Sequence, residues 1–294
     1  MSVSFSSPIL LKAFPRSGGT LFITLLDAHP EIAMSYEIYE SNLFDSDTIP
    51  LNPSFSLDML SRDIHGDDID RVKSVSEPHF RTFLFRAIRA GLCVDDICSV
   101  LDAFVSSGKS FSSSPERLFF IDLLMQAKSQ QLKKALWGGK TQSDLLVLQD
   151  LHSDPVFFIM RRDFRDVYAS MILKGNFKYS PSEAATLWVN NFRQFREFAS
   201  FSSAKTMEIV YEDLALNPEI VLKDVCDLIG VQFSEAMLSF HTKNMALFRN
   251  PFGHLSCDQL KAGINSSSIG KWKSILNPAQ IAEIEEICGD LIDF

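Results

Sequence analysis

The segment Ile9-Leu-Leu-Lys-Ala-Phe-Pro-Arg-Ser-Gly-Gly-Thr-Leu-Phe-Ile-Thr-Leu-Leu26 decides the fold class. Its apolar beginning, Ile9 to Phe14, predicts a buried strand, and the apolar run from Leu21 to Leu26 predicts a buried helix. Between them, Pro15-Arg-Ser-Gly-Gly-Thr20 predicts a glycine turn. Strand, turn and helix in this order form the opening unit of a parallel α/β sheet.

A second unit of the same kind begins at Val156-Phe-Phe-Ile-Met160, a continuous apolar run that predicts a central parallel strand. A helix is expected from Phe164 to Leu173, with its apolar stripe on Phe164, Val167, Tyr168, Met171 and Ile172. Met207 to Tyr211 predicts a further strand. Three more helices are indicated by their capping residues, which are Ser180-Pro-Ser-Glu183, Asn217-Pro218 with Gly230 as the stop, and Asn277-Pro278.

Residues 41–135 differ from this alternating pattern. They are rich in Ser and Asp at first and then mostly helical around Phe80–Leu101 and Pro115–Leu136. We interpret them as a helical insertion that forms a wall of the substrate site. The fold class is therefore α/β, a P-loop-like parallel sheet flanked by helices, in one domain over residues 1–294.

Composition excludes several classes of function. The net charge of −9 argues against nucleic acid and an anionic membrane surface as partners. The five cysteines are scattered without a CxxC pair, which favours free thiols in a reducing compartment. No apolar run approaches membrane-spanning length and no leader precedes the first strand, so we expect a cytoplasmic protein. None of the six histidines forms a metal-ligand motif, so no metal is expected.

The glycine turn matches the spacing of the P-loop pattern G-x-x-x-x-G-K-[ST], with Gly18 and Thr20 in place. Ala13 replaces the first glycine and Gly19 replaces the lysine. The turn can still present backbone N–H groups and a helix N-terminus to an anion, with Arg16 as its cation. A purely structural glycine turn is the alternative.

A second anion site is indicated after the strand that ends near Met160. Arg162 lies at its carboxyl end, where open α/β sheets bind ligands. Ser170 and Lys174 follow about two and three turns into the next helix. An arginine with a hydroxyl suits a phosphate monoester; a solvated arginine and a surface serine are the alternative.

Taken together, these motifs resemble the PAPS-dependent sulfotransferases (PAPS is 3′-phosphoadenosine-5′-phosphosulfate). The similarity is greatest to the branch of the protein-tyrosine sulfotransferases and their soluble bacterial relatives. The segments that carry it are Pro15–Leu21, Leu26-Asp-Ala-His-Pro30 with Glu37, Gly138-Gly-Lys-Thr141, Arg162–Ser170, Val210-Tyr-Glu-Asp-Leu214, and Asn265 with Lys271-Trp272. They occur in the order typical of the family. Phe164 stands where the family usually has Pro or Gly, and Gly19 where the tyrosine-sulfating branch usually has Thr.

The resemblance implies a role for each matching position. Arg16 would hold the 5′-phosphosulfate and stabilise the leaving group, and Glu37 would be the catalytic base. Lys140 would lie beside the transferring sulfate, and Ser256 would stabilise the transition state. The remaining donor-binding residues would be Ser17, Gly18, Gly19, Thr20, Arg162, Ser170, Lys174, Tyr211 and Lys271.

The chemistry agrees with these residue types. Sulfuryl transfer resembles phosphoryl transfer, in which positioning and charge stabilisation do most of the work. An acceptor hydroxyl must lose a proton, and a carboxylate such as Glu37 can accept it. If the neighbouring loop motif is not considered, the alternative interpretation is that Glu37 is a solvated acid beside Glu40.

Alternative functions remain open at this point. They are a P-loop-type small-molecule kinase, against which the missing lysine argues, and a catalytically inactive nucleotide-binding protein of the same fold. The acceptor can be a peptide tyrosine, a sugar or a small phenol or alcohol, and a homodimer is compatible with the sequence.

Overall fold

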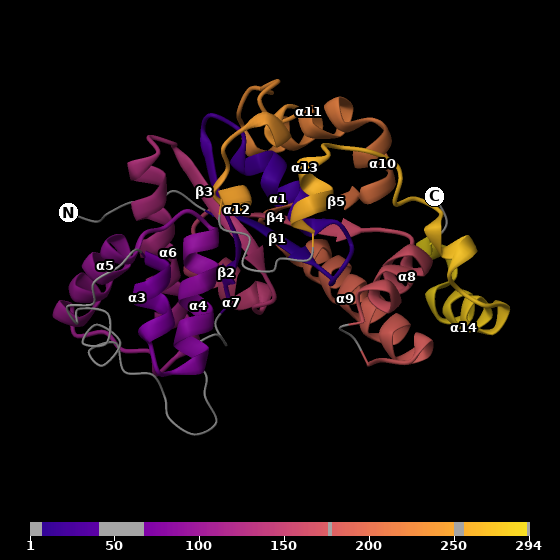
Figure 1. The fold of residues 1–294 in the computed structure, drawn as a ribbon, viewed down its shortest axis with the longest axis horizontal. Helices are drawn as coiled ribbons and strands as arrows, with labels where there is room; N and C mark the ends of the chain where they lie inside the picture. The colour runs from indigo at the N-terminus through magenta and orange to yellow at the C-terminus, as the bar shows by residue number, and fades with distance from the viewer. Residues whose placement is uncertain (1–7, 41–67, 176–177, 250–255, 293–294) are drawn as a thin grey trace.

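The computed structural model describes residues 8–40, 68–175, 178–249 and 256–292. Its centre is a five-stranded parallel sheet in the order β2-β3-β1-β4-β5 (Figure 1). The strands are β1 (Ile9–Ala13), β2 (Ile32–Tyr39), β3 (Leu136–Thr141), β4 (Val156–Arg161) and β5 (Lys205–Val210). This sheet with helices on its faces confirms the predicted fold class.

Both faces of the sheet are buried, which explains the continuous apolar runs of its strands. Along β1, Ile9, Leu11 and Ala13 belong to one hydrophobic core, whereas Leu10 belongs to the other. Along β4, Phe158 and Phe157 divide between the two cores in the same way. Because side chains alternate across a strand, a strand covered on both faces favours apolar residues at consecutive positions.

One face of the sheet is covered by helices that lie above it in Figure 1. They are α1 (Gly19–Asp27), α10 (Tyr211–Leu216), α11 (Pro218–Ile229), α12 (Ala246–Arg249) and α13 (Cys257–Lys261), with the 3-10 turn η2 (Phe240–Thr242). Gly230 ends α11 in the left-handed conformation, as predicted. Asn217 occupies the N-cap position of α11, although its side chain makes no capping hydrogen bond.

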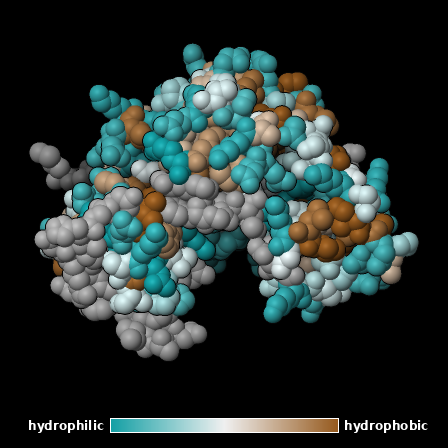
Figure 2. Space-filling view, viewed as in Figure 1, coloured by the Kyte–Doolittle hydropathy of each residue, from teal (hydrophilic) through white to brown (hydrophobic). Residues whose placement is uncertain are grey.

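The opposite face packs against two groups of helices. On one side lie α3 (Asp68–Ser74), α4 (Pro78–Arg89), α5 (Val94–Ser106) and α6 (Ser114–Gln131). Further along the sheet lie α7 (Leu145–Leu151), α8 (Phe164–Lys174), α9 (Pro181–Phe201) and α14 (Pro278–Cys288), with the 3-10 turns η3 (Lys271–Ser274) and η4 (Gly289–Ile292). The predicted capping box at Ser180 is present, and the predicted cap Asn277 also forms a capping box, with Gln280. Figure 2 shows a hollow between these two groups.

The insertion is helical where it is described, from α3 to α6, and residues 41–67 lie outside the described ranges. The stretches Phe80–Leu101 and Pro115–Leu136 are mostly helical, as predicted. The first is divided between α4 and α5, and the second leaves its helix before Leu136, which begins β3. Ile172 is 43% exposed, so the buried stripe of α8 does not include it.

Three smaller findings complete the comparison with the sequence. Tyr211 begins α10, one residue after β5 ends, rather than belonging to the strand. All five cysteines are free thiols. Among the described residues, no helix combines the length and the apolar character needed to cross a membrane.

Candidate functional site

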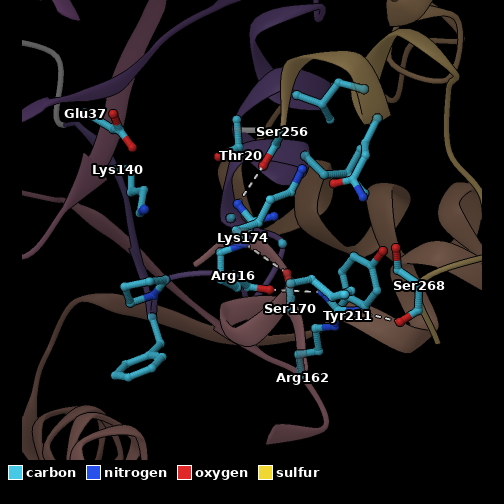
Figure 3. Close-up of a pocket in the computed structure, with 18 of the residues that line it drawn as sticks. Arg16, Thr20, Glu37, Lys140, Arg162, Ser170, Lys174, Tyr211, Ser256 and Ser268 are labelled. Carbon is cyan, nitrogen blue, oxygen red and sulfur yellow. Dashed lines mark hydrogen bonds between the residues drawn. The ribbon is translucent and has the colours of Figure 1, made fainter. Parts of the chain in front are cut away.

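A cleft of about 1080 Å³ lies at the carboxyl ends of the strands, and it is drawn in Figure 3. Each strand of the sheet supplies one polar residue to its lining. In the spatial order of the strands these are Glu37 (β2), Lys140 (β3), Arg16 (after β1), Arg162 (after β4) and Tyr211 (after β5). The sheet therefore brings together residues that are up to 195 positions apart, from 16 to 211.

The turn between β1 and α1 has an unusual backbone. Arg16 adopts a positive φ of 69°, which is rare for a residue with a side chain. Gly18, the N-cap of α1, has a φ of 97°, and a Cβ atom there would lie 2.4 Å from Cδ2 of Tyr211. Only glycine satisfies both conditions, so Gly18 lets the Tyr211 ring pack directly against the turn.

Gly19 has a different reason for being glycine. A Cβ atom on Gly19 would lie 2.6 Å from Cβ of Ala13 and 3.3 Å from Cδ2 of Leu11. A threonine side chain therefore has no room here unless β1 shifts. This close packing explains why Gly19 departs from the residue usual in the tyrosine-sulfating branch. Gly18, Gly19 and Thr20 line the cleft, where the first N–H groups of α1 lack intrahelical partners.

Two arginines converge behind this turn (Figure 3). Arg16 donates from Nε to Ser170 Oγ (3.0 Å) and from Nη1 to Ser256 Oγ (3.3 Å). Arg162 donates to the carbonyl oxygens of Arg16 (3.0 Å) and Ser268 (2.6 Å). Burial lowers the pKa of Arg16, and the positive charge of Arg162 lowers it further. Two cations whose hydrogen bonds go to neutral groups form a strong site for an anion.

Aromatic rings hold both arginine-bearing segments in place. The guanidinium of Arg162 stacks on the Tyr211 ring at 4.2 Å. Phe164, the residue after Asp163, is fully buried between Phe14 (6.0 Å between ring centres) and Trp188 (5.3 Å). The phenylalanine at this position thus joins the β1–α1 turn to α9, which gives this departure from the family pattern a packing role.

The other side of the cleft contains Glu37. Its Oε2 accepts a hydrogen bond from Arg89 Nη1 at 3.0 Å, and its carbonyl oxygen accepts from Arg86 Nη1 at 3.3 Å. Both arginines belong to α4 of the insertion. Glu37 is therefore an ion-paired acid in the cleft, which does not fit the alternative of a solvated acid beside Glu40.

Glu40 lies behind this side and does not line the cleft. Burial raises the pKa of Glu40 to about 7, although the Gln142 N–H and the charges of Lys140 and Arg86 oppose the shift. Burial lowers the pKa of Lys12, and the negative charges of Asp144 and Glu40 oppose this shift.

Nearly all the residues predicted for the site line this one cleft. They are Arg16, Gly18, Gly19, Thr20, Glu37, Lys140, Arg162, Ser170, Lys174, Tyr211, Ser256 and Lys271. Ser17 does not line it. Its side chain is fully buried, its hydroxyl has no hydrogen-bond partner among the described residues, and its amide donates to Phe14 O at 3.1 Å.

Several other lining residues were not predicted from the sequence. Arg86 and Arg89 come from α4, and Ile69, Lys73 and Phe85 complete that wall. Asp166, in the first turn of α8, also lines the cleft; it lies within the segment Arg162–Ser170, but the resemblance implied no role for it. No local motif marks the residues of α3 and α4, because only the packing of the insertion brings them to the cleft.

Comparison with known proteins agrees with this geometry. Residues 8–235 match the profile described as the sulfotransferase family. A Caenorhabditis briggsae protein provisionally named a protein-tyrosine sulfotransferase is 21% identical over 295 residues, covering 98% of this chain and 88% of that protein.

Two solved structures have a similar fold. The sulfotransferase domain from the Synechococcus PCC 7002 olefin synthase is 21% identical with a TM-score of 0.60, covering 97% of this chain and 96% of that one. The sulfotransferase domain from the curacin biosynthetic pathway is 18% identical with a TM-score of 0.56, covering 98% of each chain.

Proposed function

The chain belongs to the sulfotransferase family, and from this premise we propose that it transfers a sulfuryl group from PAPS to an acceptor hydroxyl. The observation that carries the choice of donor is the convergence of Arg16 and Arg162 in one cleft. A donor with two separate anionic groups suits two adjacent cationic sites.

In this proposal the two anionic groups of the donor occupy different parts of the cleft. Arg16 and the N-terminus of α1 bind the 5′-phosphosulfate, with backbone N–H groups from Gly18 to Thr20. The 3′-phosphate binds to Arg162, Ser170, Lys174 and Lys271. The ring of Tyr211 stacks on the guanidinium of Arg162 and holds it in place. Ser17 is left out of this arrangement, because its side chain is fully buried and its amide already donates to Phe14 O.

The reaction uses residues from both sides of the cleft. The Glu37 carboxylate accepts the proton of the acceptor hydroxyl, while the acceptor oxygen forms a bond to sulfur. The bond from sulfur to the bridging oxygen of the donor breaks, and its electron pair stays on the phosphate of PAP (3′-phosphoadenosine-5′-phosphate), the product. Arg16, Lys140 and Ser256 stabilise that developing negative charge.

The acceptor site is assigned to the side of the cleft formed by α3 and α4. Ile69 and Phe85 provide apolar contacts there, and Glu37 lies within the same cleft. We propose a peptide tyrosine, a sugar or a small phenol or alcohol as acceptor classes. The kinase alternative loses its basis, because the family match is to sulfotransferases.

Ligand-dependent unfolding tests the choice of donor. PAP should raise the midpoint of thermal unfolding, since a ligand at a hundredfold excess over its Kd stabilises the folded state by about 2.7 kcal/mol. ATP with Mg²⁺ should give a much smaller shift. Stabilisation by ATP-Mg²⁺ and none by PAP would reject the proposal.

Transfer from labelled PAPS to a panel of tyrosine peptides, sugars, phenols and alcohols tests the activity itself. We expect label on at least one acceptor class. Binding of PAP without transfer to any class would support the inactive nucleotide-binding alternative.

A further inference from the structure

The segment Asn265–Ile275, here called the C-terminal strap, borders the cleft beside α8. Asn265, Ser267, Ser268, Lys271 and Ile275 from this strap line the cleft. The strap contains the 3-10 turn η3, which packs against α8. Its residues come almost at the end of the chain, so their place beside the donor site depends on contacts with the sheet domain.

Asp166, in the first turn of α8, makes the contact that fixes the backbone of the strap. Its Oδ2 accepts the Gly270 N–H at 2.7 Å, and its Oδ1 accepts the Trp272 N–H at 2.9 Å. The residue is only 2% exposed. A buried carboxylate is costly unless it is hydrogen-bonded, and here both of its oxygens accept backbone N–H groups.

The two amides that Asp166 holds belong to the residues on either side of Lys271. Arg162, which lies between β4 and α8, and Arg165 of α8 hold the strap as well. Arg162 donates to Ser268 O at 2.6 Å, and the Arg165 guanidinium stacks on the Trp272 ring at 4.3 Å. Asp166 alone among these three contacts fixes the backbone immediately before and after Lys271.

We propose that Asp166 is a positioning residue that fixes the C-terminal strap in the unliganded enzyme, so that Lys271 already faces the donor. Asp166 raises donor affinity through Lys271 rather than by touching the donor. The role in donor affinity rests on the proposed function, because it takes PAPS as the donor. A strap that is already ordered loses less conformational entropy when the donor binds.

Charge alone predicts the opposite effect. Asp166 is an anion in the lining of a cleft that would receive phosphate groups, so simple repulsion would make its removal strengthen binding. Positioning predicts weaker binding. The sign of the change in PAP affinity in Asp166→Asn therefore separates the two explanations.

The first experiment needs no donor. Hydrogen exchange of the free wild-type chain should show the amides of Gly270 and Trp272 exchanging slowly, and Asp166→Asn should speed both by about tenfold or more, the loss expected for a charge-assisted hydrogen bond. Fast exchange in the free wild type, or unchanged exchange in the variant, would overturn the proposal. Ser180→Ala is the matched control, because it removes the N-cap of α9 without touching the strap.

The second experiment measures the Kd of PAP in a double-mutant cycle of Asp166→Asn and Lys271→Ala. We expect each single variant to weaken binding by about tenfold, and the double variant to be little weaker than either, since coupled residues are non-additive. Unchanged or tighter binding in Asp166→Asn, or fully additive losses, would contradict the proposal. If wild type fails to bind PAP, the proposed function fails, whereas the exchange result still decides whether Asp166 holds the strap.

Discussion

The two sides of the cleft are held by different kinds of contact. The loop side, made of Pro15–Leu21, α8 and the C-terminal strap, is fixed by hydrogen bonds between side chains and distant backbone groups. The insertion side, made of Glu37 with α3 and α4, has one such bond, from Arg86 to Glu37 O, and is fixed mainly by the ion pair of Glu37 with Arg89 and by packing of α4 on the core. Its boundary includes residues from helices that carry no recognisable motif.

This difference indicates a division of function between the two sides, with donor binding on the loop side and acceptor binding on the insertion side. Contacts to the backbone fix a site whose ligand does not change, whereas helix side chains can be exchanged without altering the sheet. We therefore expect substitutions on the loop side to change donor binding and the rate, and those on the insertion side to change acceptor use. A substitution that affects both ligands equally would break the division.

The largest effect is expected at Glu37, the insertion-side residue that is proposed to take the proton of the acceptor. Glu37→Gln should lower kcat by about 10²–10⁴-fold, the usual contribution of a general base, while leaving the Kd of PAP unchanged. Steady-state transfer from labelled PAPS measures the first quantity and calorimetry the second. Glu219→Gln, which alters an exposed pair with Lys223, is the control. Normal transfer in Glu37→Gln would remove Glu37 as the base.

Arg16→Ala should lower kcat by about 10²–10³-fold, because a donor aimed at developing charge is lost from the transition state. PAP affinity should fall as well, since Arg16 belongs to the loop side. Arg196→Ala is the control, because its exposed guanidinium pairs with Glu208 outside the cleft. A rate equal to that of the control would exclude Arg16 from both roles.

Arg162→Lys should weaken PAP binding by roughly a hundredfold and leave the KM of the acceptor unchanged. Lysine keeps the charge but loses the planar fork that reaches two carbonyl oxygens and stacks on Tyr211. Titration calorimetry with PAP gives the first value and acceptor kinetics the second. An acceptor KM that changes as much as the Kd would contradict the division between the two sides.

Glu40 provides a pH-dependent test of the insertion side. Its pKa of about 7 in the folded state exceeds the value of 4.5 in the unfolded chain, so between these values the folded chain binds more protons. The free energy of unfolding should thus fall by roughly 2 kcal/mol as the pH rises from about 4.5 to 7, and stay low above it. Urea unfolding of wild type and Glu40→Gln at pH 5 and 8 measures this contribution. An equal pH dependence in both proteins would show that Glu40 does not cause it.

The smallest expected effect is on acceptor binding. Phe85→Ala should raise the KM of the acceptor by about fivefold through lost apolar contact, with the Kd of PAP unchanged. Phe201→Ala, which shortens an aromatic side chain that is 60% exposed, is the control. A change in PAP affinity with an unchanged acceptor KM would show that Phe85 contributes to donor binding rather than acceptor binding, and would contradict the proposed division.

The sequence predicted the loop side better than the insertion side for a physical reason. Local apolar runs and turn residues in the sequence predict β1, α1, β4 and α8. β2 and β3 were not predicted. In β3 the pair Gly138-Gly139 interrupts the apolar pattern by which a strand is predicted. Gly138 lies so close to β1 that a Cβ atom would be 1.9 Å from Ile9 O. Tertiary packing, rather than strand propensity, therefore selects this residue.

The site shows the same limit. Ser17 was included because it sits within a motif, but the turn directs its side chain into the interior. Arg89 was missed because its partner Glu37 is 52 residues away in the sequence. Local patterns identify residues on one turn or helix, whereas an ion pair between distant segments becomes visible only in the folded chain.

The row of polar residues at the strand ends sets the distances between the parts of the cleft. Neighbouring strands in a sheet lie about 4.8 Å apart, so β2, which carries Glu37, and β5, which Tyr211 follows, are roughly 19 Å apart across the five strands. Chain order runs Arg16, Glu37, Lys140, but the sheet interleaves them as Glu37, Lys140, Arg16. The order in which acceptor, sulfuryl group and nucleotide would meet the protein is thus a property of strand topology, and loops can lengthen or shorten without changing it.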